Sequence, residues 1–223
     1  MWFGSKRRRQ EVWNPYAFAV LKDDGSVVSW GRNKYGSEVF GGDSSSVASQ
    51  LQSSVTQIFS NERAFAALKD DGSVVTWGDS RYGGDGSSVA SQLQSGVTQI
   101  FSDGSAFAAL KDDGSVVTWG YSSYGGDSSS VASQLQSGVT QIFSSKNAFA
   151  ALKDDGSVVT WGDSKKGGDS SSVASQLQSG VTQIFSSKYA FAALKDDGSV
   201  VTWGILYSSG DSSSVASQLQ SGV

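Results

Sequence analysis

The chain has 223 residues, with 27 Gly, one Pro, no Cys and no His. The missing Cys exclude a disulfide framework and a thiolate zinc site, and the missing His exclude an imidazole base, a catalytic triad and a His-anchored metal centre. A hydrophobic content of 38% and a net charge of −4 are typical of a soluble chain. We therefore expect a protein that is not an enzyme and that uses no metal and no cofactor.

The chain begins with a basic arm, residues 1–8, and its basic run comprises Lys6, Arg7, Arg8 and Arg9. No apolar segment follows this run, so it is not typical of a secretory signal, and no apolar run reaches the roughly 18 residues that cross a bilayer. We interpret the arm as a solvated tail, with a nuclear address or a phosphate-contacting arm as alternatives. The sequence assigns no single compartment. It favours an intracellular location, and an organelle such as the chloroplast fits if a targeting segment was removed.

Five copies of one pattern fill residues 9–223. The string AFAxLKDDGSVVxWG begins at Ala17, Ala64, Ala106, Ala148 and Ala190, and the first spacing is longer because residues 36–40 are inserted after Tyr35. The later spacings are all 42 residues, and a period in this range is typical of propellers, solenoids and arrays. We expect one repeat domain with units at about 9–54, 55–96, 97–138, 139–180 and 181–223.

The third unit illustrates the local structure that the pattern predicts. Its β-branched and aromatic segment 97–102 indicates a first strand, 106–111 a second and 115–119 a third, with an Asp-Asp-Gly turn between the last two. These strands form an antiparallel meander. Residues 127–138 are ambiguous, because their Val, Ala and Leu fit helical spacing with a Gly at the C-cap, yet they also alternate as a strand would. We favour a short helix.

The expected fold class is mainly β: a five-unit repeat toroid that resembles a β-propeller, with three antiparallel strands plus a short helix or fourth strand per unit. The last unit ends 8 residues short of the period, and residues 9–16 occupy that register before the first unit, so a closed ring is arithmetically complete. The polar segment 7–12 is instead typical of an end cap. An open β/α solenoid is therefore the alternative.

Two segments, 138–142 (GVTQI) and 151–162 (ALKDDGSVVTWG), resemble the regulator of chromosome condensation repeat, and the resemblance covers all five units. It implies that the units are blades of a β-propeller, and it implies a chromatin-associated or GTPase-exchange role. The chain is also similar to the long, nearly identical repeat arrays of some single-celled algae.

Differences between the five units gather before the second strand and after the third, which are adjacent ends of a meander, whereas the constant Asp-Asp-Gly turns leave from the opposite end. The constant parts hold five Lys against fifteen Asp, while the variable loops have a net charge of +3. We expect one mildly basic, Tyr-bearing face that suits protein contact. Its candidate residues are Arg32, Lys34, Tyr35, Glu38, Val39, Phe40, Arg63, Arg81, Tyr82, Tyr121, Tyr124, Lys165, Lys166, Tyr189 and Tyr207.

The function that we favour is a non-enzymatic interaction or scaffold module, an accessory subunit that docks onto a larger assembly through its variable loops or its chain ends. The insertion 36–40 breaks the symmetry of the repeat and offers Phe40 as an apolar anchor. Lectin-like ligand binding is a further alternative. The Asp pairs are interpreted as turn residues rather than calcium ligands, and the Trp residues as core; nucleic acid is an unlikely partner because the chain is acidic.

Overall fold

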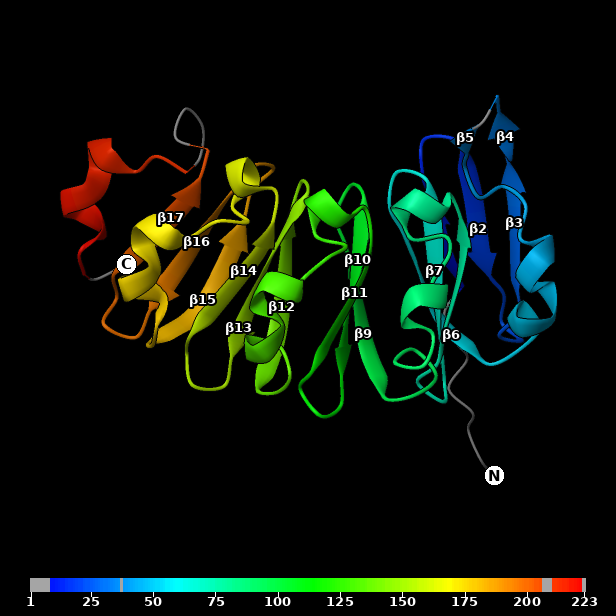
Figure 1. Ribbon diagram of the computed structural model, residues 1–223, viewed down its shortest axis with the longest axis horizontal. Coiled ribbons are helices and arrows are strands. Elements are labelled where there is room, and N and C mark those ends of the chain that lie inside the picture. Colours follow the sequence, from blue (N-terminus) through cyan, green and yellow to red (C-terminus); the bar gives the residue numbers. More distant parts are fainter. Residues whose placement is uncertain (1–8, 37, 206–209, 222–223) are drawn as a thin grey trace.

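The computed structural model describes residues 9–36, 38–205 and 210–221. Within these residues, five antiparallel three-stranded sheets and one two-stranded hairpin follow one another along the chain. Figure 1 shows the sheets as a row of blades, with the first at one end and the fifth at the other. The blades are β1 (Gln10–Trp13), β2 (Ala17–Leu21) and β3 (Val27–Gly31); β6 (Val55–Ser60), β7 (Ala64–Lys69) and β8 (Val74–Gly78); β9 (Val97–Ser102), β10 (Ala106–Lys111) and β11 (Val116–Gly120); β12 (Val139–Ser145), β13 (Ala148–Lys153) and β14 (Val158–Gly162); and β15 (Val181–Ser186), β16 (Ala190–Lys195) and β17 (Val200–Gly204).

The Asp-Asp-Gly segments form the predicted turns. In the third blade, the Asp113 carboxylate accepts hydrogen bonds from the backbone N–H of Ser115 at 2.9 Å and from its hydroxyl at 2.6 Å. These bonds stabilise the ionised form and lower the pKa of Asp113. Gly114 takes the positive φ of 74° that a side chain disfavours. The turn Asp residues are therefore structural.

The ambiguous segment of each unit is helical, as 3-10 helices: η1 (Ser45–Leu51), η3 (Ser87–Val89), η5 (Ser129–Gln134), η7 (Ser171–Leu177) and η8 (Ser213–Leu219). A carboxylate precedes each helix; the Asp127 Oδ1 accepts the N–H of Ser129 at 2.9 Å. At the other end, Leu135 is buried against the next blade. Shorter 3-10 turns, η2 (Ser80–Tyr82), η4 (Ser122–Tyr124) and η6 (Ser164–Lys166), follow the third strands of blades two to four.

The core lies between the blades. Phe107 and Trp119 stack at 5.3 Å on one face of the third blade and pack against Ala64, Ala66 and Leu68 of the second. The Trp119 Nε1–H donates a hydrogen bond to the Gly83 carbonyl of the second blade at 3.1 Å. The same cluster recurs between each pair of neighbours. Large aromatic rings against small Ala side chains thus join the units.

The row is open at its ends. The outward face of the first blade leaves Phe18 and Trp30 47% and 48% exposed, whereas the equivalent Phe65 and Trp77 of the second blade are 0% and 2% exposed under the first. Figure 1 places β1–β3 and β15–β17 far apart. The mainly β, propeller-like repeat is confirmed. The described blades form an open array, so the closed five-unit ring that we expected is not formed among them. Among these residues, no helix has the length and apolar character needed to cross a membrane.

Candidate protein-interaction surfaces

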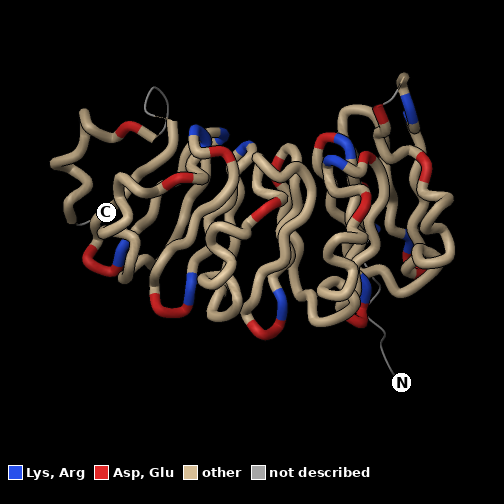
Figure 2. The backbone as a smooth tube through the Cα atoms, viewed as in Figure 1, with Lys and Arg blue, Asp and Glu red and all other residues tan. Residues whose placement is uncertain are grey.

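The variable loops share one edge of the row. In the third blade, Ala106 pairs with Gly120, which brings residues 103–105 next to residues 121–124 at one end of the sheet. Figure 2 shows the Asp-Asp-Gly turns with their lysines along the lower edge and the loop charges along the upper edge. We call the upper edge the loop edge.

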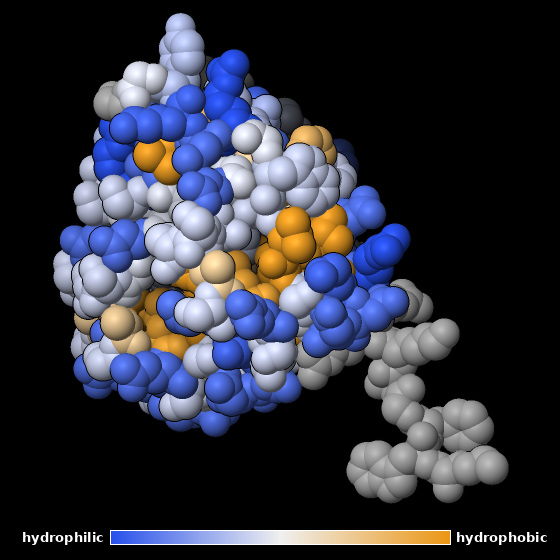
Figure 3. Space-filling model, turned by 90° about the vertical axis from the view of Figure 1, so that its right-hand side faces the viewer, coloured by the Kyte–Doolittle hydropathy of each residue, from blue (hydrophilic) through white to orange (hydrophobic). Residues whose placement is uncertain are grey.

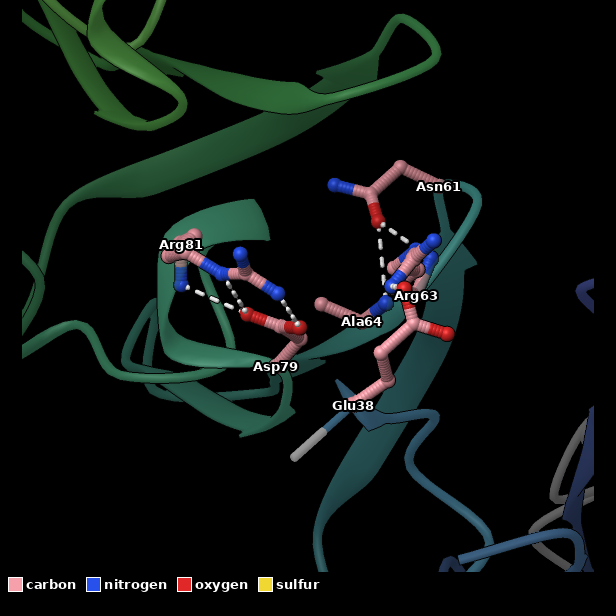
Figure 4. Close-up of polar contacts among 6 residues, drawn as sticks. All are labelled: Glu38, Asn61, Arg63, Ala64, Asp79 and Arg81. Atoms are coloured by element: carbon pink, nitrogen blue, oxygen red, sulfur yellow. Dashed lines mark hydrogen bonds and ion pairs between the residues drawn. The ribbon is translucent and has the colours of Figure 1, made fainter. Parts of the chain in front are cut away.

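Arg63 connects the inserted hairpin to the second blade (Figure 4). The hairpin comprises β4 (Lys34–Tyr35) and β5 (Glu38–Val39), and the Glu38 carboxylate pairs with the Arg63 Nη1 at 2.8 Å. The guanidinium lies over the Phe40 ring at 5.4 Å and over the Tyr82 ring at 5.1 Å. The hydrogen bond to Glu38 raises the pKa of Arg63. This arginine is therefore committed to contacts inside the chain.

The structure corrects the role expected for Phe40. Its ring is 1% exposed, between Tyr16, whose ring centroid lies 4.1 Å away, and Arg63. Its carbonyl accepts a hydrogen bond from the Asn14 amide at 3.0 Å. The inserted hairpin thus uses Phe40 to seal the first and second blades together, and the ring is not available as an anchor for a partner.

Arg81 is also paired inside the chain. Its guanidinium and backbone N–H both bind the buried Asp79 carboxylate, with the Nη2 at 3.0 Å (Figure 4). Asn61 plays the corresponding role for the other loop, because its Oδ1 accepts the N–H groups of Arg63 and Ala64. These contacts fix the loops of the second blade.

Other candidate residues remain at the surface. Arg32 lies over the exposed Tyr35 ring at 5.3 Å, and Tyr121 contacts both Tyr82 and Tyr124. Lys34 is exposed, and Val39 is partly buried. Arg9 is exposed, whereas Lys6, Arg7, Arg8 and Tyr207 lie outside the described residues.

Three lysines, Lys146, Lys166 and Lys188, lie around Tyr189 at the loop edge of the last two blades, and Lys165 precedes Lys166 in η6; we call these four residues the lysine cluster. The ammonium nitrogens of Lys166 and Lys188 lie 3.9 Å and 5.0 Å from the Tyr189 ring centroid. A hydrogen bond from Lys188, together with the charges of Lys188, Lys166 and Lys146, lowers the pKa of Tyr189. The candidate set from the sequence contained Lys165, Lys166 and Tyr189 but missed Lys146 and Lys188, which come from adjacent blades.

The outward face of the first blade carries a row of aromatic side chains that the sequence interpretation assigned to core. Trp13 pairs with Phe18, and Phe18 pairs with Trp30, across the three strands. Trp13 is 65% exposed, and Phe18 and Trp30 stack at 5.5 Å. We call Trp13, Phe18, Val28 and Trp30 the end face; Figure 3 looks onto this end of the molecule and shows apolar side chains gathered between hydrophilic ones.

One signal in the sequence could have pointed to the end face. By strand register, Glu11 stands where the second blade has Ile58, and Trp13 stands where it has Ser60. Ile58 is buried against the first blade, and the Ser60 hydroxyl donates to the Trp13 carbonyl at 3.0 Å. The first unit therefore departs from the repeat at the positions that contact a preceding blade.

Similar grooves recur at three successive interfaces, between the 3-10 helix of one blade and the turn of the next; one is lined by Gln92, Asp113, Ser115 and Asp127.

Asp103 is buried, its Oδ2 has no partner among the described residues, and burial raises its pKa to about 7. The described residues contain no group of three His, Cys, Asp or Glu side chains that could hold a metal ion.

Comparison with known proteins shows the fold. No family model and no curated protein matches the chain. The blades have the fold of RCC1-like β-propeller repeats. A crystal structure of yeast RCC1 (Prp20) bound to Kap60 aligns with a TM-score of 0.54 and 14% identity over 87% of this chain and 55% of that one. Human WBSCR16 aligns with a TM-score of 0.51 and 22% identity over 86% of this chain and 60% of that one. The chain thus spans little more than half the length of these propellers.

Proposed function

We propose that the chain is a non-enzymatic protein-interaction module, an accessory subunit that docks onto a larger assembly through the end face. One observation carries this proposal: the face that the preceding blade buries in blades two to five is exposed in the first blade, where it presents two Trp and a Phe. Exposed, rigid aromatic side chains supply much of the binding energy at protein interfaces. Yeast RCC1 (Prp20), which has this fold, is bound to Kap60 in its crystal structure, and this supports a protein-binding role.

The end face differs from the face that a further repeat unit would require. A blade that stacked here as the others do would bury Glu11 in the place of Ile58, and burying an unpaired carboxylate is expensive. It would also have to accommodate the Trp13 ring in the place of a serine. These differences favour a partner that is not a further repeat unit and that places a cation opposite Glu11.

The test is quantitative partner capture with matched variants. Phe18→Ser combined with Trp30→Ser removes the stacked pair of the end face, and Phe185→Ser removes an aromatic side chain that is 52% exposed at the opposite end of the row. We expect the first variant to lose partners that wild type and Phe185→Ser both recover, with all three unfolding at similar temperatures. Equal recovery by all three proteins would refute the end face as the docking surface.

A second candidate function is ligand binding in the repeated grooves. Its support is that hydroxyl, carboxylate and amide side chains line equivalent grooves at three interfaces, a composition that suits a polyhydroxylated ligand. Titration with a panel of oligosaccharides, followed by calorimetry, tests this: binding at several equivalent sites is expected, and its loss in Gln92→Ala would be confined to one of them.

A further inference from the structure

We propose that the lysine cluster binds an acidic segment of a protein partner. This inference goes beyond the end face, because the cluster lies on the loop edge of the fourth and fifth blades and does not use the aromatic row. Lys146, Lys165 and Lys188 are exposed, Lys166 is partly buried, and Lys165 and Lys166 are adjacent residues of η6. The cluster therefore gathers positive charge at one part of the loop edge.

The cluster is held in place before any ligand binds. The Lys146 N–H donates to the Lys188 carbonyl at 2.9 Å, which joins the loops of two neighbouring blades. The Lys165 N–H donates to the Asp163 carboxylate at 2.9 Å, which fixes the start of η6. The Tyr189 ring accepts cation–π contacts from two of the ammonium groups, those of Lys166 and Lys188. Such fixed loops reduce the entropy that binding must remove.

The charge of the cluster is mostly uncompensated. Among the described residues, Lys146 pairs with Glu62 at 3.4 Å, and no carboxylate lies within ion-pair distance of the ammonium groups of Lys165, Lys166 or Lys188. The loop edge of the second blade differs, because Arg63 and Arg81 are both paired with acids. Among the described loop residues, Arg32 and Lys34 of the first unit also lack an ion pair, but the cluster holds the larger group of unpaired cations. This group attracts anionic groups over roughly 10 Å at moderate ionic strength.

The surroundings favour a short acidic peptide over a nucleic acid. The opposite edge of the blades carries the Asp-Asp-Gly turns, and the whole chain has a net charge of −4. An extended polyanion would approach these acids as well as the lysines, whereas a few carboxylates fit within the cluster. Glutamate and aspartate side chains are the anions that such a segment supplies.

The test measures binding of a labelled polyglutamate peptide by fluorescence anisotropy, with single-stranded DNA of equal charge as the competing probe. Lys166→Gln combined with Lys188→Gln removes two charges from the cluster, and Lys69→Gln combined with Lys153→Gln removes two from the turn edge, so both variants have the same net charge. We expect the cluster variant to bind the peptide about tenfold more weakly than wild type, and the turn variant about as well as wild type.

Three further binding measurements decide whether the proposal holds. Lys166→Arg with Lys188→Arg should restore binding, and Phe18→Ser with Trp30→Ser should leave it unchanged, so that failure of the cluster and failure of the end face are distinguishable. Higher salt should weaken the complex. Equal weakening by both Gln variants, or tighter binding of DNA than of peptide, would overturn the proposal.

Discussion

The indole nitrogen of Trp119 donates to the carbonyl oxygen of Gly83 in the preceding blade, at 3.1 Å. The bond requires the Trp and Phe pair to lie directly on the glycine: a Cβ built on Gly83 would lie 2.9 Å from the Phe107 ring and from Trp119, and the φ of Gly83 is +90°. The same relationship joins Trp77 to Gly41, Trp161 to Gly125 and Trp203 to Gly167. The first Gly of each Gly-Gly step is therefore an interface residue.

Gly83→Ala should destabilise the protein by about 3 kcal/mol, because the methyl group overlaps a buried ring and the residue keeps a positive φ. Denaturant unfolding measures the change. Gly104→Ala is the matched control: its new Cβ meets only the ends of the Glu62 and Asn147 side chains, at 3.3 Å. Equal effects at Gly83 and Gly104 would contradict the close packing of the Phe107 and Trp119 rings on Gly83.

Ser54→Gly should stabilise the protein by about 1 kcal/mol. Ser54 has a φ of 67°, in the left-handed region, where the equivalent residues Gly96, Gly138 and Gly180 have φ between 75° and 77°. The reverse change, Gly96→Ser, should lower the stability, because its Cβ would also lie 3.0 Å from the Asp112 carboxylate. Thermal unfolding of both variants gives opposite shifts if backbone strain decides the outcome.

Asp103→Asn should stabilise the protein at pH 8 by on the order of 2 kcal/mol. The equivalent Asn61 donates its amide to the Tyr82 carbonyl at 2.6 Å, whereas the Asp103 Oδ2 has no partner among the described residues. Its pKa is raised from 3.8 to about 7 by burial, so the folded state binds a proton that the unfolded state lacks between these values. The free energy of unfolding should fall as the pH rises from about 4 to about 7, and this slope should be smaller in Asp103→Asn.

Asp113→Asn provides the contrast. The hydroxyl and N–H of Ser115 lower the pKa of this exposed turn Asp, so its stabilising contribution is present above the unfolded pKa and is lost as the pH falls through the folded one. Asp113→Asn should therefore lower the free energy of unfolding at neutral pH and leave it unchanged in acid. Opposite pH profiles for the two Asn variants are the expected result; parallel profiles would exclude Asp103 as the source of the slope.

Copies of the chain should not stack end to end. The repeat has a glycine at Gly167, whose Cβ would lie 2.6 Å from the Phe191 ring, but Ser209 at the corresponding position of the last unit. Position 209 lies outside the described residues. Together with Glu11 and Trp13 at the other end, this change of residue predicts that the two ends of the row do not fit one another.

Restoring the repeat residues should create a self-assembling protein. The variant with Glu11→Ile, Trp13→Ser and Ser209→Gly should associate head to tail as its concentration rises, since such contacts do not close. Sedimentation velocity measures this against a monomeric wild type. Adding Phe18→Ser should abolish the association. A wild type that already forms long oligomers would contradict the prediction.

The sequence predicts the blades closely because their signals are local. The expected second strand at 106–111 is β10 to the residue, and the Asp-Asp-Gly turn and the helical segment after the third strand are also confirmed. The sequence analysis identified only two of the four lysines of the cluster, because Lys146 and Lys188 come together through packing of neighbouring blades. Phe40 was misjudged for a related reason: Tyr16 and Arg63, which cover its ring, come from loops of two different blades.

The hydroxyl of Ser102 binds the carbonyl of Ser60, and the hydroxyl of Ser144 binds that of Ser102, so consecutive interfaces are chemically interchangeable. Recombination between in-register repeats could therefore remove residues 97–138 and join Gly96 to Val139 without creating a new kind of interface. Such an event would shorten the distance between the end face and the lysine cluster by one blade. Loss or gain of whole units would thus change the separation of these two surfaces in steps of one blade and leave the residues of both surfaces unchanged.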